Sequence, residues 1–331
     1  MIELIPESGK FYKVNLHCHT DISDGVDSRE AVKAFYKANG YSAVCFTDHE
    51  VLLSHKDLCD EDFVALHGYE VAIKQDIHQH TGWFMPVYHF NMIAKDPDNL
   101  KMPRFFRDNP SYPGNARKWM ESCAQYDETI DVAYYDKEWL NDYLGAVAEG
   151  GFLITYNHPE WSLQNSSDYL GLQHLHAIEV SNGGCMPWMD RSGIHFQQML
   201  RSGMRVVPVG GDDNHHMGDA QKAWTMIKAE NLSYKALMEA YEKGHCYASE
   251  GPEILSLTLD GGKIRVKTSE TVDIVLRSQG RWLQIQRAES APLTGAEFDY
   301  APEKMGAFFR IEVRDAAGNR AYSNAYYTDS L

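Results

Sequence analysis

The sequence predicts an α/β fold, with a largely parallel sheet or α/β barrel followed by a small antiparallel β domain. From residue 14 to about residue 250, short apolar runs alternate with amphipathic stretches of helical period. This alternation is typical of parallel sheets and barrels. Beyond Gly251 the helical period stops and strand-like runs follow one another. The length of 331 residues suits a barrel of about 250 residues with an appended domain.

The elements of the first part follow from hydrophobic periodicity and helix end signals. Ser28 is a suitable N-cap for the first helix, and Asn39 with Gly40 is a suitable end. Residues 96–114 interrupt the alternation with prolines, so we expect an inserted loop there that could lie over the active site. The expected helices are 28–39, 115–126, 136–149, 189–202 and 233–243. The expected strands are 14–19, 42–47, 63–73, 86–94, 152–156, 176–180, 205–210 and 224–228.

Residues 251–331 are expected to form a separate all-β domain, so the predicted division of the chain is 1–250 and 251–331. Turn signals such as Asp260-Gly261-Gly262 separate the strand-like runs. The expected strands are 254–259, 263–267, 272–278, 282–287, 307–314 and 320–327.

Composition and charge exclude several classes of protein. No run approaches 18 apolar residues, so we expect no transmembrane helix, and the N-terminus lacks the basic start and apolar core of a signal peptide. The six cysteines are scattered without a C-x-x-C spacing, which favours a reduced, cytoplasmic protein. The formal net charge of −16, without a basic run, argues against binding a nucleic-acid polymer.

The most informative motif is a pair of histidines at the end of the first apolar run. His17 and His19 are two residues apart, so in a strand both imidazoles point to the same side. Asp24 follows closely and can offer a carboxylate. Histidine nitrogen and carboxylate oxygen are the ligands of Zn, Mn and Fe hydrolytic sites. The motif therefore predicts a metal-dependent hydrolase.

Polar side chains of ligand type recur at the ends of seven successive expected strands. Active sites of α/β barrels are built at the carboxyl ends of the strands. A purely structural explanation would place apolar or turn residues there, and it accounts poorly for this pattern. The residues are His17, His19, Asp24, Asp48, His49, Glu70, His89, Asn91, Asn157, His158, Glu179, Asn182, Asp212, Asp213 and His215.

Taken together, five motifs resemble those of the PHP (polymerase and histidinol phosphatase) domain over roughly residues 12–250. They are His17-Cys18-His19 with Ser23-Asp24-Gly25, Thr47-Asp48-His49, Glu70, Asn157-His158-Pro159 and Asp213-Asn214-His215. The resemblance implies a distorted (β/α)7 barrel, two or three divalent metal ions (usually Zn, Mn or Fe) and phosphoester hydrolysis. The segment from Arg310 to Asn324 resembles the end of a PHP subgroup whose barrel carries a small β-sandwich.

The resemblance also implies a ligand set, with Glu70, Asp213 and His215 as the catalytic residues. His17, His19 and Asp213 would hold one metal, and Glu70 would bridge it to a second metal completed by His89 and His158. Asp24, His49 and His215 would hold a third, although Asp24 stands where some members have histidine. His78 and His80 compete with His89, but the strand-like surroundings of His89 favour it.

The expected chemistry is hydrolysis of a small phosphomonoester or phosphodiester. Metal coordination lowers the pKa of water from about 15.7 to near 7, and metals about 3.5–4 Å apart can clamp the attacking and leaving oxygens. Two alternatives stay open. The same hydroxide could attack a carboxylic ester, amide or carbamate, or the barrel could be a metal-binding regulatory or interaction module. The oligomeric state is not determined.

Substrate-binding residues are less certain in the sequence than the metal ligands. Arg117 and Arg191 could bind a phosphate bidentately, although a surface salt bridge explains each equally well. Asn182 follows an expected strand and is a further candidate. Trp161, Trp188 and Tyr156 could stack on an aromatic or sugar group, although ordinary packing is the more common role of such residues.

Overall fold

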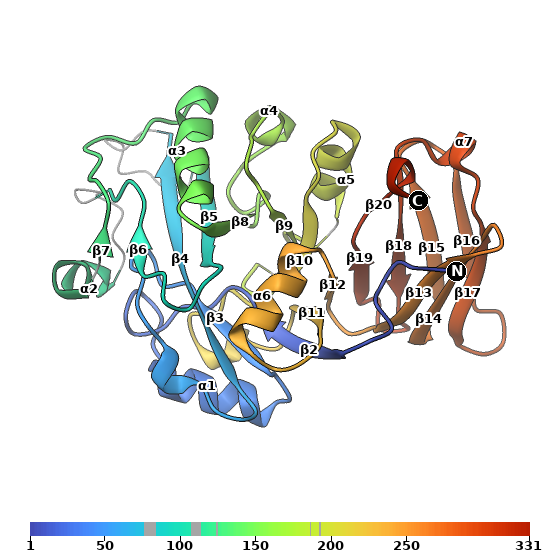
Figure 1. Cartoon of the computed structure of the whole chain (residues 1–331), viewed down its shortest axis with the longest axis horizontal. Coiled ribbons are helices and arrows are strands. Elements are labelled where there is room, and N and C mark those ends of the chain that lie inside the picture. The colour runs from blue at the N-terminus through green and yellow to red at the C-terminus, as the bar shows by residue number, and fades with distance from the viewer. Residues whose placement is uncertain (76–83, 107–113, 124, 186, 192) are drawn as a thin grey trace.

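The computed structural model describes residues 1–331 except 76–83, 107–113, 124, 186 and 192 (Figure 1). The described residues form a mixed α/β fold with one large sheet and a separate antiparallel sheet. The helices are α1 (Arg29–Ala38), α2 (Ala116–Cys123), α3 (Lys137–Glu149), α4 (Ser166–Tyr169), α5 (Ile194–Arg201), α6 (Tyr234–Glu242) and α7 (Pro302–Met305), with short 3₁₀ turns η1 (Lys56–Leu58), η3 (Met217–Asp219) and η4 (Thr328–Ser330).

The strands alternate with these helices up to β12 and then follow one another. They are β1 (Ile2–Glu3), β2 (Lys10–Asn15), β3 (Ala43–Phe46), β4 (Val64–Lys74), β5 (Val87–Ala94), β6 (Lys101–Met102), β7 (Gln125–Tyr126), β8 (Phe152–Tyr156), β9 (Ala177–Asn182), β10 (Val207–Gly211), β11 (Trp224–Ala229), β12 (Cys246–Ser249), β13 (Ile254–Asp260), β14 (Lys263–Thr271), β15 (Asp273–Ser278), β16 (Leu283–Arg287), β17 (Leu293–Asp299), β18 (Phe308–Arg314), β19 (Arg320–Ser323) and β20 (Tyr326–Tyr327).

The large sheet is mixed rather than largely parallel. Its order is β10-β9-β8-β5-β4-β3-β2-β11-β12-β19-β18-β15-β16, with β20 beside β18. The pairs β2–β3, β3–β4, β8–β9 and β9–β10 are parallel, whereas β5 is antiparallel to both β4 and β8. The expectation of a largely parallel sheet is therefore wrong at β5, and also at β11, which is antiparallel to both β2 and β12.

The large sheet curls around an apolar core that lies beneath the candidate site. Buried side chains from β2 to β5 and from β8 to β12 meet in one cluster, which Leu237 and Tyr241 of α6 complete. The two ends of this stretch also approach each other, because the Gly210 N–H of β10 donates to Thr225 Oγ1 of β11. The strand ends consequently converge on one region.

Helices α1, α3 and α6 begin next to the predicted residues, because polar caps satisfy their first amide groups, whereas α4 and α7 were not predicted. Ser28 accepts a hydrogen bond from the Ala31 N–H at the start of α1, and Asp136 does the same for α3. Helix α5 starts at Ile194, later than expected, and follows Gly193 in a left-handed conformation. In Figure 1, α3, α4 and α5 stand in a row along the upper side of the large sheet.

The C-terminal strands form a β-sandwich that is joined to the rest of the chain at both ends. Strands β13, β14 and β17 make the separate sheet with β1, so the first residues of the chain pair with β13. Strands β15, β16, β18, β19 and β20 instead extend the large sheet, because β19 pairs with β12. Strand β17 is absent from the sequence prediction.

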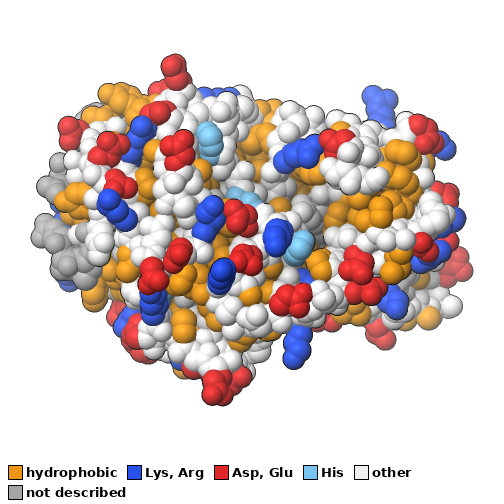
Figure 2. All heavy atoms as spheres, in the orientation of Figure 1, with side chains coloured by type: hydrophobic (Ala, Val, Ile, Leu, Met, Phe, Trp, Pro, Cys, Tyr) orange, Lys and Arg blue, Asp and Glu red, His pale blue; other side chains and the backbone are white. Residues whose placement is uncertain are grey.

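The surface in Figure 2 carries acidic and basic side chains interspersed, without a continuous basic band on that face. Within the described residues, no helix has the length and apolar character that crossing a membrane requires. The expected inserted loop contains β6 and Phe105, which forms an isolated bridge with Thr129. Residues 107–113 of this loop lie outside the described residues, as do His78 and His80.

Candidate metal centre

Most of the candidate site is built on segments that follow the strands, whereas Glu70 and His89 lie within β4 and β5. Strand β2 ends at Asn15, so His17 and His19 lie after it rather than within it. The segment that carries them runs beside the segment after β10, where the Asp213 N–H donates to His17 O and the His19 N–H donates to Asn214 O. On its other side, Thr47 Oγ1 accepts from the Cys18 N–H. His49 pairs in the same way beside Glu70.

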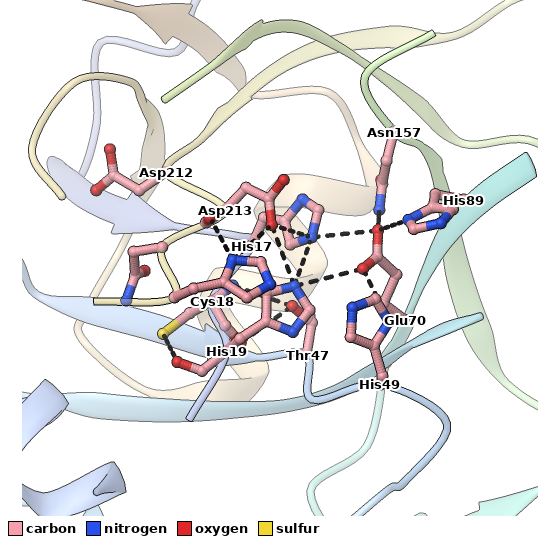
Figure 3. Close-up of polar contacts among 12 residues, drawn as sticks. His17, Cys18, His19, Thr47, His49, Glu70, His89, Asn157, Asp212 and Asp213 are labelled. Carbon is pink, nitrogen blue, oxygen red and sulfur yellow. Dashed lines mark hydrogen bonds and ion pairs between the residues drawn. The ribbon is translucent and has the colours of Figure 1, made fainter. Parts of the chain in front are cut away.

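The structure brings all nine predicted metal ligands into one cluster. Figure 3 shows His17, His19, Glu70 and Asp213 pointing toward one another, while Asp212 points away. Four groups within the cluster have ligand atoms within 4.8 Å of one another. They are His19 with Asp24, His49 and His215; His17 with His19 and Glu70; His17 with His158 and Asp213; and Glu70 with His89 and His158.

Glu70 lies at the centre of this cluster. Its Oε1 atom is 3.0 Å from His89 Nδ1 and 3.3 Å from His158 Nε2. Its Oε2 atom is 3.3 Å from both His19 Nε2 and His49 Nδ1. The Asn157 side-chain amide donates to Oε1 at 2.7 Å and fixes the carboxylate. Oε1 is also 3.3 Å from His17 Nε2, so the carboxylate lies among five histidines, three at Oε1 and two at Oε2.

The cluster is buried on one side and open on the other. His17, His19, Glu70 and His158 are almost fully buried. The side chains of His215 and Asp24 are 37% and 29% exposed, and their closest atoms are 3.4 Å apart. Substrate can therefore approach at the group that contains Asp24 and His215.

The backbone is strained at two of the candidate ligands. His158 has a φ of 21° and Asp213 a φ of 48°. Residues other than glycine rarely adopt this region, and such strain is typically retained at functional sites. Asp213 uses this conformation to direct its carboxylate inward. Its neighbour Asp212 accepts instead from Tyr36 Oη and from the backbone of residues 221–223.

The carboxylates of the cluster need positive charge beside them. Among the described residues, every ion-pair partner of Glu70, Asp213 and Asp24 is a histidine. Burial lowers the pKa of His19, but its contacts with Asp213 and Glu70 outweigh burial and raise that pKa to about 10. Burial also lowers the pKa of His158, but the contacts of this histidine with Glu70 and Asp213 outweigh burial and raise that pKa to about 9.

The donor atoms fit divalent metal ions. His17 Nδ1 lies 2.8 Å from Glu179 Oε1, so this nitrogen donates and His17 Nε2 presents a lone pair. That Nε2 atom is only 3.2 Å from His19 Nε2. In addition, the buried Nδ1 atoms of His19 and His49 have no hydrogen-bond partner. Nitrogen lone pairs and carboxylates crowded in this way are the donor set that Zn, Mn or Fe prefers.

The family model of the PHP domain matches residues 15–150. This segment is therefore similar to the PHP domain. Six of the nine candidate ligands lie within the match, namely His17, His19, Asp24, His49, Glu70 and His89. His158, Asp213 and His215 lie beyond it and join the cluster in space. The comparison with curated proteins gave no match.

Several solved structures are similar to the chain, each with a TM-score below 0.5. A two-domain protein from Bacteroides vulgatus, described as containing a predicted PHP-like metal-dependent phosphoesterase, shares 15% identity over 98% of both chains, with a TM-score of 0.47. A lesion-specific endonuclease from Pyrococcus furiosus shares 12% identity over 71% of this chain and 56% of its own, with a TM-score of 0.41. An amidohydrolase from Chromobacterium violaceum shares 16% identity over 62% and 88%, with a TM-score of 0.40.

Glu179 is a residue of the candidate site whose role the sequence does not reveal. It lies within β9, is buried, and accepts from His17 Nδ1 through Oε1. Its Oε2 atom accepts from the His158 N–H at 3.1 Å and from Asn182 Nδ2 at 2.9 Å. A carboxylate placed in this way fixes the tautomer and the orientation of a ligating histidine. Its position at the end of an expected strand was the only signal.

Asp48 and His158 are also held by hydrogen bonds around the candidate site. Asp48 accepts from the backbone and hydroxyl groups of Thr20 and Ser23, so it shapes the loop that carries Asp24. His158 Nδ1 lies 3.1 Å from Ser162 Oγ, which leaves Nε2 facing Glu70.

The three candidate substrate-binding residues lie in different surroundings. Asn182 Nδ2 is 3.2 Å from Asp213 Oδ2, so Asn182 belongs to the cluster. Arg191 Nε donates to the buried Glu250 at 2.8 Å, and its Nη2 donates to Asn319 at 3.0 Å. Arg191 therefore links the loop after β9 to the C-terminal strands. Arg117 is exposed on α2.

Proposed function

We propose that this protein is a metal-dependent phosphoesterase that hydrolyses a small phosphomonoester or phosphodiester. The observation that carries the proposal is Glu70, whose carboxylate lies within 3.3 Å of five histidine side chains, as a ligand shared between metal ions would. We further propose that residues 1–250 form the distorted (β/α)7 barrel of the PHP family and that residues 251–331 form a separate β domain.

In this proposal His17, His19 and Asp213 hold one metal ion, and Glu70 bridges it to a second held by His89 and His158. Asp24, His49 and His215 hold a third. Zn, Mn and Fe all suit these ligands. When bound, such ions supply a hydroxide nucleophile at neutral pH and neutralise charge on the phosphoryl oxygens.

The chain's own residues orient the site. Glu179 keeps the proton of His17 on Nδ1, so that Nε2 faces the cluster. Asn157 holds the Glu70 carboxylate, and Asn182 holds that of Asp213. The exposed side of the cluster, at Asp24 and His215, receives the phosphate. His215 is the most exposed of the histidines in the cluster, and its Nδ1 atom lies 3.1 Å from Asp213 O, which leaves Nε2 for the third metal ion beside Asp24.

A small substrate is favoured over a nucleic-acid polymer. The net charge is −16, and tight binding of a long phosphate backbone requires clustered Lys and Arg. Among the described residues, the arginine in the loop after β9, Arg191, is paired with Glu250.

The test is a hydrolysis screen with metal-stripped protein, to which Zn, Mn or Fe is added back. The panel contains phosphomonoesters, phosphodiesters, an oligonucleotide, carboxylesters and amides. We expect phosphoester cleavage that depends on added metal and that, in ¹⁸O-water, places the label in phosphate without a covalent phospho-enzyme. Cleavage confined to carboxylesters or amides would contradict the phosphoesterase proposal. No cleavage with any metal would favour a binding module.

A further inference from the structure

Trp161 lies directly beside two of the candidate ligands and yet faces solvent. Its ring centroid is 5.1 Å from that of His158 and 5.5 Å from that of His89, in edge-to-face arrangements. The side chain is nevertheless 46% exposed. A large aromatic ring at the rim of a polar metal site therefore leaves much of its surface open to whatever binds there.

The turn that carries Trp161 is fixed by a buried carboxylate. The backbone N–H groups of Glu160 and Trp161 donate to the two oxygens of Asp190, each at 2.8 Å. The Asp190 N–H donates in return to Glu160 Oε2 at 3.0 Å. Asp190 itself is 4% exposed and adopts a φ of 50°. This reciprocal pairing holds the tryptophan at the rim before any substrate arrives, which reduces the entropy cost of using it for binding.

The other aromatic residues singled out in the sequence do not share this position. Tyr156 is fully buried and packs among Tyr88, Phe90 and Tyr169, so packing explains it. Trp188 is 86% exposed. Trp161 combines contact with the ligand histidines and an open surface.

We propose that Trp161 is a specificity-determining residue, whose exposed surface binds a planar apolar ring in the organic part of the phosphoester. The inference rests on the proposed function, because the phosphate must sit on the metal cluster for its organic substituent to lie over Trp161. The preferred substrates are then aryl or other ring-bearing phosphoesters rather than purely aliphatic ones. Stacking of a flat ring on an aromatic side chain supplies the selectivity.

A second apolar site competes for the same role. A pocket of about 390 Å³ is lined by Ile22, Leu52 and Leu53, on the loops that carry Asp24 and His49, and by Trp119 of α2. Trp119 is 39% exposed, which is close to the value for Trp161. Ring contacts with candidate metal ligands distinguish Trp161. Trp119 is therefore a matched control whose replacement tests the competing pocket.

The experiment compares the affinities of metal-loaded protein for phenylphosphonate and methylphosphonate by calorimetry. Neither phosphonate is a hydrolysable ester, so binding is measured independently of catalysis. We expect the wild type to prefer phenylphosphonate, and Trp161→Ala to weaken that ligand about ten-fold while changing methylphosphonate less than about two-fold. Trp161→Phe should keep most of the preference, and Trp119→Ala all of it.

Trp161→Leu guards against an indirect effect through His89 and His158. It keeps apolar bulk beside the histidines, so the metal content should stay at the wild-type value while the preference for phenylphosphonate is lost. Equal binding of the two phosphonates by the wild type would overturn the inference. So would a preference that survives in Trp161→Leu, or one that Trp119→Ala abolishes. If the preference depends on Trp161 but no phosphoester is hydrolysed, the proposed function fails and the ring-binding role stands.

Discussion

Replacing Glu179 with glutamine tests whether the hydrogen bonds around the cluster control metal binding. Glu179 Oε1 faces one donor, His17 Nδ1, whereas Oε2 faces two donors, the His158 N–H and Asn182 Nδ2. Glutamine has a single carbonyl oxygen, which makes more hydrogen bonds at the position of Oε2, where two donors face it. The amide NH₂ then faces His17 Nδ1 and drives the proton of His17 to Nε2.

A proton on His17 Nε2 removes the lone pair that faces His19 and Glu70. Changes to groups that orient a ligating histidine typically cost about 10- to 100-fold in metal affinity, which is about 1.4–2.7 kcal/mol. We expect a loss of this size in Glu179→Gln. The assay is competition for metal with a chromophoric chelator at pH 7.5, with denaturant unfolding as a check on the fold.

Glu250→Gln is the matched control. Glu250 is also a buried carboxylate that accepts several hydrogen bonds, but its partners are Ser181, Arg191 and the Arg320 N–H rather than a candidate ligand. This variant should lose stability and keep the metal affinity. If Glu179→Gln binds metal within two-fold of the wild type, or no more weakly than Glu250→Gln, the role assigned to Glu179 is wrong.

Three further predictions follow from the same contacts. Glu70→Ala should lower metal affinity and activity at least about ten-fold more than His78→Ala or His80→Ala, because Glu70 bridges; equal losses in metal titrations would show that the second metal site is misassigned. Burial lowers the pKa of His67 to about 4, below its usual value near 6.5. The folded chain therefore holds this imidazole neutral, and the stability that His67 contributes is full above about pH 6.5 and is lost as the pH falls toward 4. In urea unfolding between pH 7 and pH 5, the wild type should therefore lose about 2 kcal/mol more than His67→Gln, and equal losses would refute this. Arg191→Gln should lower the free energy of unfolding by about 1–2 kcal/mol because it removes a partner of the buried Glu250; a raised KM without lost stability would instead favour phosphate binding by Arg191.

The ligand types could be predicted from the sequence because they lie within or just after successive strands, whose ends meet in one region of the fold. The feature of the fold that brings His17 and His19 together differs from the one predicted. Strand alternation does not place them, because β2 ends at Asn15. Pairing with residues 213 and 214 does so instead, and that contact joins segments almost 200 residues apart.

Other features required the folded chain. The role of Glu179 depends on β9 facing the end of β2, although the two strands are far apart in the sheet order. Strand β17 was missed because Gly295 and its polar neighbours hide the alternation. The pairing of β1 with β13, and of β12 with β19, is also non-local and leaves no mark in local periodicity. The predicted division at residue 250 stays a prediction.

The central claim is that the cluster around Glu70 binds metal ions, and the most direct measurement is the metal content of the purified chain. Elemental analysis of unchelated protein, repeated after Zn, Mn or Fe is added back and excess metal is removed, should find two to three equivalents per chain. Glu70→Ala measured in parallel should fall by at least one equivalent. Less than one equivalent in the wild type, even after metal is added back, would contradict the account.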